Sequence, residues 1–134
     1  MGVIILPKVA TISVWMAEAD QTPLESRHCV RCEPGTPHLD SSEIGALLGQ
    51  LDGWTIEETD AHLRLAKRYK FKGFMPPVEF VNRLAPIAEA EGHHPDLLVS
   101  YGSVTIYLWT HAAGGLTEND FILAAKIDGA STNS

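Results

Sequence analysis

Cysteine, basic charge and long apolar runs are all scarce in this sequence. Its 134 residues include two cysteines, which are too few for a disulfide framework. No run of 18 apolar residues occurs, so the sequence offers no membrane-spanning segment. Ten Lys and Arg residues stand against 17 Asp and Glu residues, and this net charge of −7 argues against binding to a nucleic-acid backbone. These absences favour a soluble cytoplasmic protein, and the length corresponds to one ordinary domain.

The composition supports a packed core, with 45% hydrophobic and 20% charged residues. Residues 1–40 stand apart, because they show no sustained hydrophobic period and contain several prolines. Their first stretch is mildly apolar, lacks a charged start and is interrupted by Pro7 and Lys8. We interpret it as a loosely attached leader rather than a secretory signal. We therefore expect an extended N-terminal arm over residues 1–40 and a folded domain over residues 41–134.

Local patterns in the first half of the domain predict a helix and then a hairpin. A serine cap at Ser41–Ser42 precedes apolar residues at helical spacing, and Gly53 is placed to end the helix. Residues 53–59 and 61–71 have strand character and are joined at Asp60. These two segments therefore predict a β-hairpin.

The second half repeats this order and adds a final helix. Two prolines at the start and Gly92 at the end predict a helix over residues 75–92, with Pro86 expected to kink it. A second hairpin over residues 97–111 turns near Gly102, and Thr117 caps the last helix. The apolar positions expected to face inward on the two helices are Val78, Val81, Leu84, Ala85, Ala88, Phe121, Ala124, Ala125 and Ile127.

Taken together, the elements predict an α+β fold in the order α-β-β-α-β-β-α. Its four-stranded antiparallel sheet carries the three helices on one face. In the last strand Val104, Ile106 and Leu108 alternate with residues that include Tyr107 and Trp109. The second sheet face is therefore expected to be open and partly apolar, which favours self-association.

The stretch "EAEGHHPD" carries the first candidate chemistry. His93 and His94 follow the carbonyl end of a predicted helix, where partial negative charge favours a protonated imidazole. Pro95 restricts the backbone of His94 and so fixes the direction of its ring. Glu89 stands four residues before His93, so its carboxylate can orient an imidazole. Two imidazoles with a carboxylate suit proton transfer near neutral pH. The alternative is a solvated turn that happens to contain histidines.

The stretch "WTHAAGGLTENDF" carries the second. His111 is predicted to end the last strand, and one hairpin separates it from His94, so it can return to the same pocket. Thr117 and Asp120 have the spacing of a capping box, so a simple capping role for Asp120 stands beside a functional one.

A longer set of residues agrees in type and spacing with one known pattern. It comprises Glu89, His93, His94, Pro95, Tyr101, Thr110, His111, Gly115, Leu116, Thr117, Asp120 and Phe121. This set resembles the signature of the pterin-4a-carbinolamine dehydratases, and the wider match runs from about Leu39 to Gly129. The resemblance implies the α+β fold predicted above, assembled as a homodimer or homotetramer.

The resemblance also implies a reaction. The substrate is a 4a-hydroxytetrahydropterin left by an aromatic amino-acid hydroxylase, and loss of water gives a quinonoid dihydropterin. No metal or redox cofactor is implied, since no electrons change hands. The implied catalytic residues are His93, His94 and His111, and the supporting or substrate-binding residues are Glu89, Asp120, Pro95 and Thr110. We expect His94 and His111 to transfer protons and His93 to hold the pterin.

Some residues depart from the family pattern. Leu97 and Leu98 stand where many relatives have an aromatic residue, so the pocket wall is expected to differ, and Pro86 is an unusual residue that could shift Glu89.

Two other functions compete with the dehydratase. One is a non-catalytic, protein-binding relative such as a Rubisco assembly factor, although such relatives tend to lose the histidine set. The other is a metal-binding module of His93, His94, His111 and a carboxylate, which ranks last because adjacent histidine rings diverge. Cys29 and Cys32, with His28 and His38 nearby, have metal-ligand spacing but lack a second ligand pair at zinc-finger distance. We interpret them as a subfamily feature.

Overall fold

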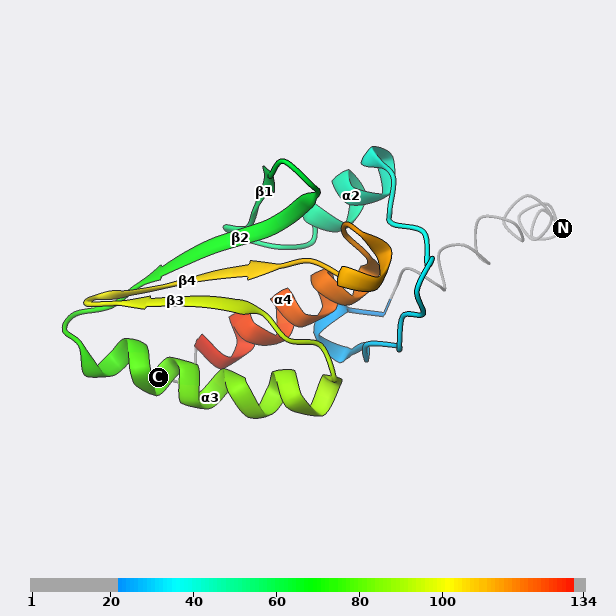
Figure 1. Cartoon of the computed structure of the whole chain (residues 1–134). Coiled ribbons are helices and arrows are strands. Elements are labelled where there is room, and N and C mark those ends of the chain that lie inside the picture. The colour runs from blue at the N-terminus through cyan, green and yellow to red at the C-terminus, as the bar shows by residue number, and fades with distance from the viewer. Residues whose placement is uncertain (1–21, 132–134) are drawn as a thin grey trace, which may run out of the picture.

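The computed structural model describes residues 22–131 (Figure 1). The predicted leader lies outside these residues. The helix–hairpin–helix–hairpin–helix order is confirmed, and residues 22–131 contain two additional short 3₁₀ helices. The elements are η2 (Leu24–Ser26), α2 (Ser41–Leu48), β1 (Thr55–Glu58), β2 (Leu63–Lys70), α3 (Met75–Glu91), β3 (Asp96–Ser100), β4 (Ser103–Leu108), η3 (His111–Ala113) and α4 (Glu118–Ser131).

Within residues 22–131, four strands form one antiparallel sheet in the order β1-β2-β4-β3. Each hairpin pairs its own two strands, and the β2–β4 pairing joins the hairpins at the centre of the sheet. In that central pairing Leu65 lies opposite Leu108 and Tyr69 lies opposite Val104. Because side chains alternate between the faces, these residues point to the same side. The predicted α+β fold is therefore confirmed.

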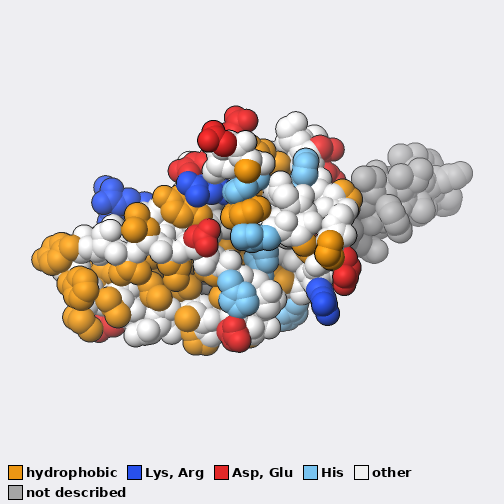
Figure 2. Space-filling model, in the orientation of Figure 1, with side chains coloured by type: hydrophobic (Ala, Val, Ile, Leu, Met, Phe, Trp, Pro, Cys, Tyr) orange, Lys and Arg blue, Asp and Glu red, His pale blue; other side chains and the backbone are white. Residues whose placement is uncertain are grey.

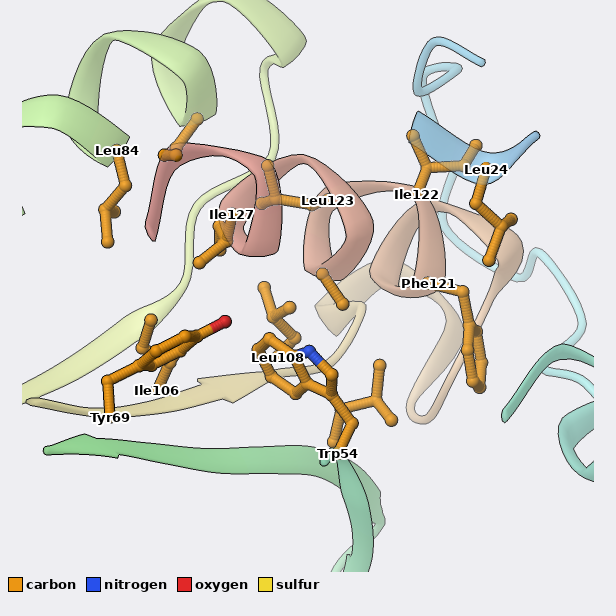
Figure 3. Close-up of a cluster of buried hydrophobic side chains, with 14 of the residues drawn as sticks. Leu24, Trp54, Tyr69, Leu84, Ile106, Leu108, Phe121, Ile122, Leu123 and Ile127 are labelled. Carbon is orange, nitrogen blue, oxygen red and sulfur yellow. The ribbon is translucent and has the colours of Figure 1, made fainter. Parts of the chain in front are cut away.

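The core lies between the sheet and the helices, with α4 packed along the helix-side face (Figures 1 and 3). Burying such apolar side chains is the main favourable contribution to folding. Tyr69 donates a hydrogen bond to Asp128 of α4, and burial together with that carboxylate raises the pKa of Tyr69. Fully buried apolar side chains of this core include Leu65, Phe80, Val104, Ile106, Leu108, Phe121, Leu123 and Ile127.

Three details of the helices differ from the predictions. Asp40, rather than a serine, caps α2: its carboxylate accepts from the Glu43 amide, and the Glu43 side chain accepts from the Asp40 amide. The helix ends at Leu48 and not at Gly53, which instead takes a positive φ of 83° in the following turn. On α3, the inward position predicted at Ala85 is exposed, and the prediction missed two fully buried residues, Pro77 and Phe80.

The second half of the predicted arm packs against the domain. Leu24 in η2 belongs to the buried core and lies beside Ile122 of α4 (Figure 3). Lys126 of α4 also donates a hydrogen bond to the carbonyl of Glu25. Residues 22–40 therefore form part of the folded structure and are more than an appendage.

The sheet face opposite the helices is less open than expected. The Arg64 guanidinium lies 3.8 Å from the centre of the Tyr107 ring, and Trp109 is also partly covered. Exposed apolar side chains gather instead on β3, the edge strand, and on the start of α3 (Figure 2). None of the helices between residues 22 and 131 is long and apolar enough to cross a membrane.

Candidate active site

A glycine turn at the end of α3 sets the position of the paired histidines. Gly92 adopts the left-handed conformation, with φ of 64°, and the His93 amide donates to the carbonyl of Ala88. A glycine meets this requirement without steric cost, and the bond from His93 closes the last helical turn. The chain leaves the helix axis at this point, as the sequence predicted, and His93 and His94 follow at the carbonyl end of α3.

His93 is hydrogen-bonded to a buried carboxylate. Its Nε2 donates to Asp120 Oδ1 at 2.6 Å, and Asp120 is fully buried. The second oxygen, Oδ2, accepts from the Thr110 hydroxyl at 2.8 Å and from the Thr117 amide at 3.0 Å. The bond from the Thr117 amide caps the start of α4. Asp120 therefore caps α4 and also fixes the orientation of the His93 ring. The capping interpretation of Asp120 is therefore confirmed, and its functional role stays a prediction.

His94 is paired with the other predicted carboxylate, in a different setting. Its Nε2 donates to Glu89 Oε1 at 2.8 Å. The His94 side chain is 63% exposed and that of Glu89 81% exposed, so water competes for this pair. Pro86 lies inside α3, one turn before Glu89, and Glu89 still reaches the His–His turn.

His111 belongs to a different segment from the paired histidines, the turn that follows β4. It was predicted to end the last strand, but β4 ends at Leu108 and His111 begins η3. Thr110 and Gly115 bridge the base of this turn, with the Thr110 amide donating to the Gly115 carbonyl at 2.8 Å. The His111 ring stacks on Trp109, with centroids 3.8 Å apart.

These elements surround a cavity of about 720 Å³. The three predicted histidines line it together with Pro95 and Thr110, while Asp120 and Glu89 reach it through His93 and His94. Figure 2 shows several histidine side chains gathered on this face of the molecule. Leu97 and Leu98, which were expected to change the pocket wall, lie on β3 outside the residues that line the cavity.

The arm supplies a wall of the cavity that sequence reasoning missed. Val30, Arg31 and Cys32 line it. The Asn119 side chain binds both polar groups of the Val30 backbone, at 3.0 Å to the amide and 2.6 Å to the carbonyl. Asn119 directly precedes Asp120 in the chain. No periodic pattern marked this irregular segment, so the sequence held no signal for the contact.

A second set of hydrogen bonds joins the arm to the end of α3. Glu91 accepts from the Cys29 amide at 2.7 Å and from the His28 ring at 2.9 Å. Burial alone raises the pKa of the Glu91 carboxyl, but these hydrogen bonds and the nearby Lys126 charge lower it overall. Burial, with the Glu91 and Asp120 carboxylates, raises the pKa of the Cys29 thiol to about 12.

The two cysteines are free thiols. Cys29 Sγ lies 3.6 Å from the Asn119 carbonyl oxygen, and Cys32 Sγ lies 3.5 Å from the Asn119 amide nitrogen. Across residues 22–131, no group of three or more His, Cys, Asp or Glu side chains is arranged to hold a metal ion. Both cysteine side chains therefore contact Asn119.

Comparison with known proteins places this chain in a family. Residues 37–130 match the family model described as pterin 4 alpha carbinolamine dehydratase. The chain belongs to the pterin-4a-carbinolamine dehydratase family. Two relatives are named "Putative pterin-4-alpha-carbinolamine dehydratase": one from Rickettsia bellii is 49% identical over 78% of this chain and 91% of that protein. The other, from Chlorobaculum tepidum, is 42% identical over 80% of this chain and 96% of that protein.

Solved structures of this dehydratase family share the fold. A transcriptional coactivator/pterin dehydratase from Brucella melitensis superposes with a TM-score of 0.63 at 33% identity, covering 69% of this chain and 97% of that one. A pterin dehydratase-like protein identified as a RuBisCO assembly factor in the alpha-carboxysome superposes with a TM-score of 0.52 at 26% identity, covering 62% and 94%. The fold therefore hosts more than one function, and the site must decide between them.

Proposed function

We propose that this protein catalyses the loss of water from a 4a-hydroxytetrahydropterin, giving a quinonoid dihydropterin. The observation that carries this proposal is the shared cavity of His93, His94 and His111, two of which are paired with carboxylates. Family membership supports the same reaction.

The reaction needs two proton transfers and no change of oxidation state. The bond between C4a and the hydroxyl oxygen breaks as that oxygen takes a proton, and the N5 proton is removed as the C4a–N5 double bond forms. A general acid and a general base held on the two sides of the ring are sufficient. Imidazoles suit both tasks, because their ordinary pKa lies near neutral pH. The reaction therefore calls for no metal or redox cofactor.

The contacts of each histidine support a division of roles. An ionised carboxylate only accepts hydrogen bonds, so Nε2 of His93 carries a hydrogen and a neutral ring leaves Nδ1 as an acceptor. Asp120 fixes that ring, which suits His93 to holding the pterin. His94 and His111 are more exposed and suit the proton transfers, with Glu89 orienting His94. Thr110 supports Asp120, and Pro95 restricts the backbone of His94.

The proposed function places the protein in pterin recycling beside an aromatic amino-acid hydroxylase. The test is a coupled assay in which such a hydroxylase generates the 4a-hydroxypterin and the purified protein is added. We expect dehydration well above the spontaneous rate, and a large loss of this acceleration in His94→Ala. A rate equal to the control without protein would refute the proposal and would favour a protein-binding role like that of the assembly factor.

We further propose that the protein works as a homodimer or homotetramer. β3 is an edge strand whose five residues are all exposed, and it carries Leu97, Leu98 and Val99. An exposed apolar edge strand is a template for pairing with a second strand. Light scattering should give a mass of at least twice the 14.6 kDa chain, and Leu98→Lys should lower it. A monomer mass at micromolar concentration would contradict this assembly.

A further inference from the structure

Three aromatic rings form a continuous stack that ends in the cavity. The His62 and Trp109 rings are nearly parallel, at 12°, with centroids 3.5 Å apart. The Trp109 and His111 rings follow with centroids 3.8 Å apart at 29°. His62 precedes β2 and Trp109 follows β4, so the central pairing of the sheet brings them together. The sequence prediction placed Trp109 on the open sheet face and gave His62 no role.

The stack is anchored at its far end. His62 Nδ1 donates to the Leu63 carbonyl at 3.1 Å, which fixes the direction of the ring. The Thr59 hydroxyl donates to the His62 carbonyl at 2.9 Å, and the His62 amide lies 3.1 Å from the same hydroxyl oxygen. The first ring is therefore tied to the turn between β1 and β2.

The occupied faces of Trp109 argue against a direct role in binding substrate. Trp109 lines the cavity, where an indole face would be a natural platform for a flat pterin ring. One face is covered by His62 and the other by His111, so neither is free for a ligand. Trp109 instead contacts His111, which we propose transfers a proton.

His111 needs such support more than the other two histidines do. His93 and His94 are each held by a carboxylate. The ring of His111 has no hydrogen-bond or ion-pair partner among residues 22–131, and the residue is exposed. The final torsion of a histidine side chain is broad when nothing restrains it. Proton transfer requires the ring within hydrogen-bond reach of its target, so an unrestrained ring would be a poor catalyst.

We propose that Trp109 and His62 are positioning residues that hold the ring of His111 by stacking, in place of the carboxylate that holds each of the other histidines. This inference rests on the proposed function for its kinetic consequence, while the stack itself can be tested without turnover. Trp109 is the direct support, and His62 restrains Trp109 from its second face.

Kinetics separates positioning from substrate binding. Trp109→Leu should lower kcat about tenfold or more with KM changed less than about twofold, because the ring is misplaced while the pterin contacts remain. Trp109→Phe keeps a flat ring and should recover most of the loss. His62→Leu should lower kcat about threefold, and the matched variant His62→Phe should restore it. A rise in KM at constant kcat in Trp109→Leu would overturn the inference, since it would place the indole against the substrate.

Proton NMR of the histidine rings tests the stack in the absence of substrate. His111 lies over an indole face, so its ring protons should be shifted upfield by the ring current, and His111→Asn identifies them by their loss. Trp109→Leu should return these signals to ordinary positions, and His62→Leu should reduce the shift. Unshifted His111 signals in the unaltered protein would overturn the inference. Shifted signals in a protein without turnover would refute the proposed function and still support the stack.

Discussion

The adjacent residues His93 and His94 differ in how far their side chains and their carboxylate partners are exposed to solvent. The His93 side chain is 12% exposed and binds a carboxylate that is fully buried. The His94 side chain is 63% exposed and binds a carboxylate that is 81% exposed. Both pairs are short, at 2.6 and 2.8 Å, so distance alone does not distinguish them.

The difference in burial gives the two pairs different strengths. An exposed pair is weakened by water and by the entropy of holding two side chains, whereas a buried pair is stronger and costly to break. Asp120 also accepts from Thr110 and Thr117, so moving it would leave several polar groups unpaired. The site therefore combines a rigid half around His93 with an adaptable half around His94. The proposed reaction would use both halves, because the substrate ring must be held in place while protons are transferred to and from it.

The largest expected effect is on the rigid half. Asp120→Asn keeps the shape but exchanges one acceptor oxygen for a donor. At least one of the three hydrogen bonds to the carboxylate is lost, and two are lost if the amide nitrogen replaces Oδ2. We expect the free energy of unfolding to fall by about 3 kcal/mol, together with loss of the proposed dehydratase activity. Urea unfolding measures the first, and Asp40→Asn is the control, because asparagine caps a helix about as well as aspartate. Equal stability of the two variants would mean that Asp120 acts only as a helix cap, and the half around His93 would then not be rigid in the sense proposed.

The second prediction compares the two histidines directly. His94→Ala should lower kcat about a hundredfold, in the range of lost acid–base catalysis, and change stability by less than about 0.5 kcal/mol because the residue is exposed. His93→Ala should raise KM and destabilise the protein by about 2 kcal/mol, since it leaves a buried carboxylate unpaired. Steady-state kinetics and urea unfolding of both variants test this division. The reverse pattern would exchange the proposed roles.

The sequence predicted this comparison only in part. Gly92 was correctly predicted to end α3, because a glycine cap is a local signal. The partner of each histidine was not predictable in the same way. Glu89 stands four residues before His93, but that spacing brings side chains together only while the helix continues, and the left-handed turn at Gly92 brings His94 to Glu89 instead. Asp120 lies 27 residues from His93, a distance at which only the fold decides contacts.

The elements and their order were predictable because alternation and helical spacing are local properties of the chain. Helix ends were less so. Gly53 was predicted to end α2, but the helix ends at Leu48 and its C-cap is Gly49. The arm could not be predicted, since the contacts of Val30 use backbone groups that carry no side-chain signal. The stacking of His62 likewise depends on strand pairing across the sheet.

A smaller effect is expected on the adaptable half. Glu89→Gln keeps a hydrogen-bond acceptor beside His94 and removes the charge. Because the pair is exposed, we expect kcat to fall less than about fivefold and the stability to change by less than about 0.5 kcal/mol. Kinetics at two salt concentrations measures the effect. A loss as large as that of Asp120→Asn would show that both halves depend equally on their carboxylates.

The last prediction concerns neither half directly but the arm beside His93, and it is expected to leave activity and stability unchanged in the unaltered protein. The pKa of Cys29 is raised to about 12, so in the folded protein the thiol keeps its proton at pH 8.5, where an unfolded chain with an ordinary pKa of 9.0 is partly ionised. Since the thiolate is the reactive form, iodoacetamide should modify Cys29 at least about a hundredfold more slowly in the folded protein than in urea. Trypsin cleaves after Arg27 and Arg31, so mass spectrometry follows Cys29 in a peptide separate from that of Cys32. Asn119→Ala removes the two hydrogen bonds to the backbone of Val30 and should accelerate the modification of Cys29. Equal rates in the folded and unfolded chains would mean that the arm does not shield the His93 side of the site.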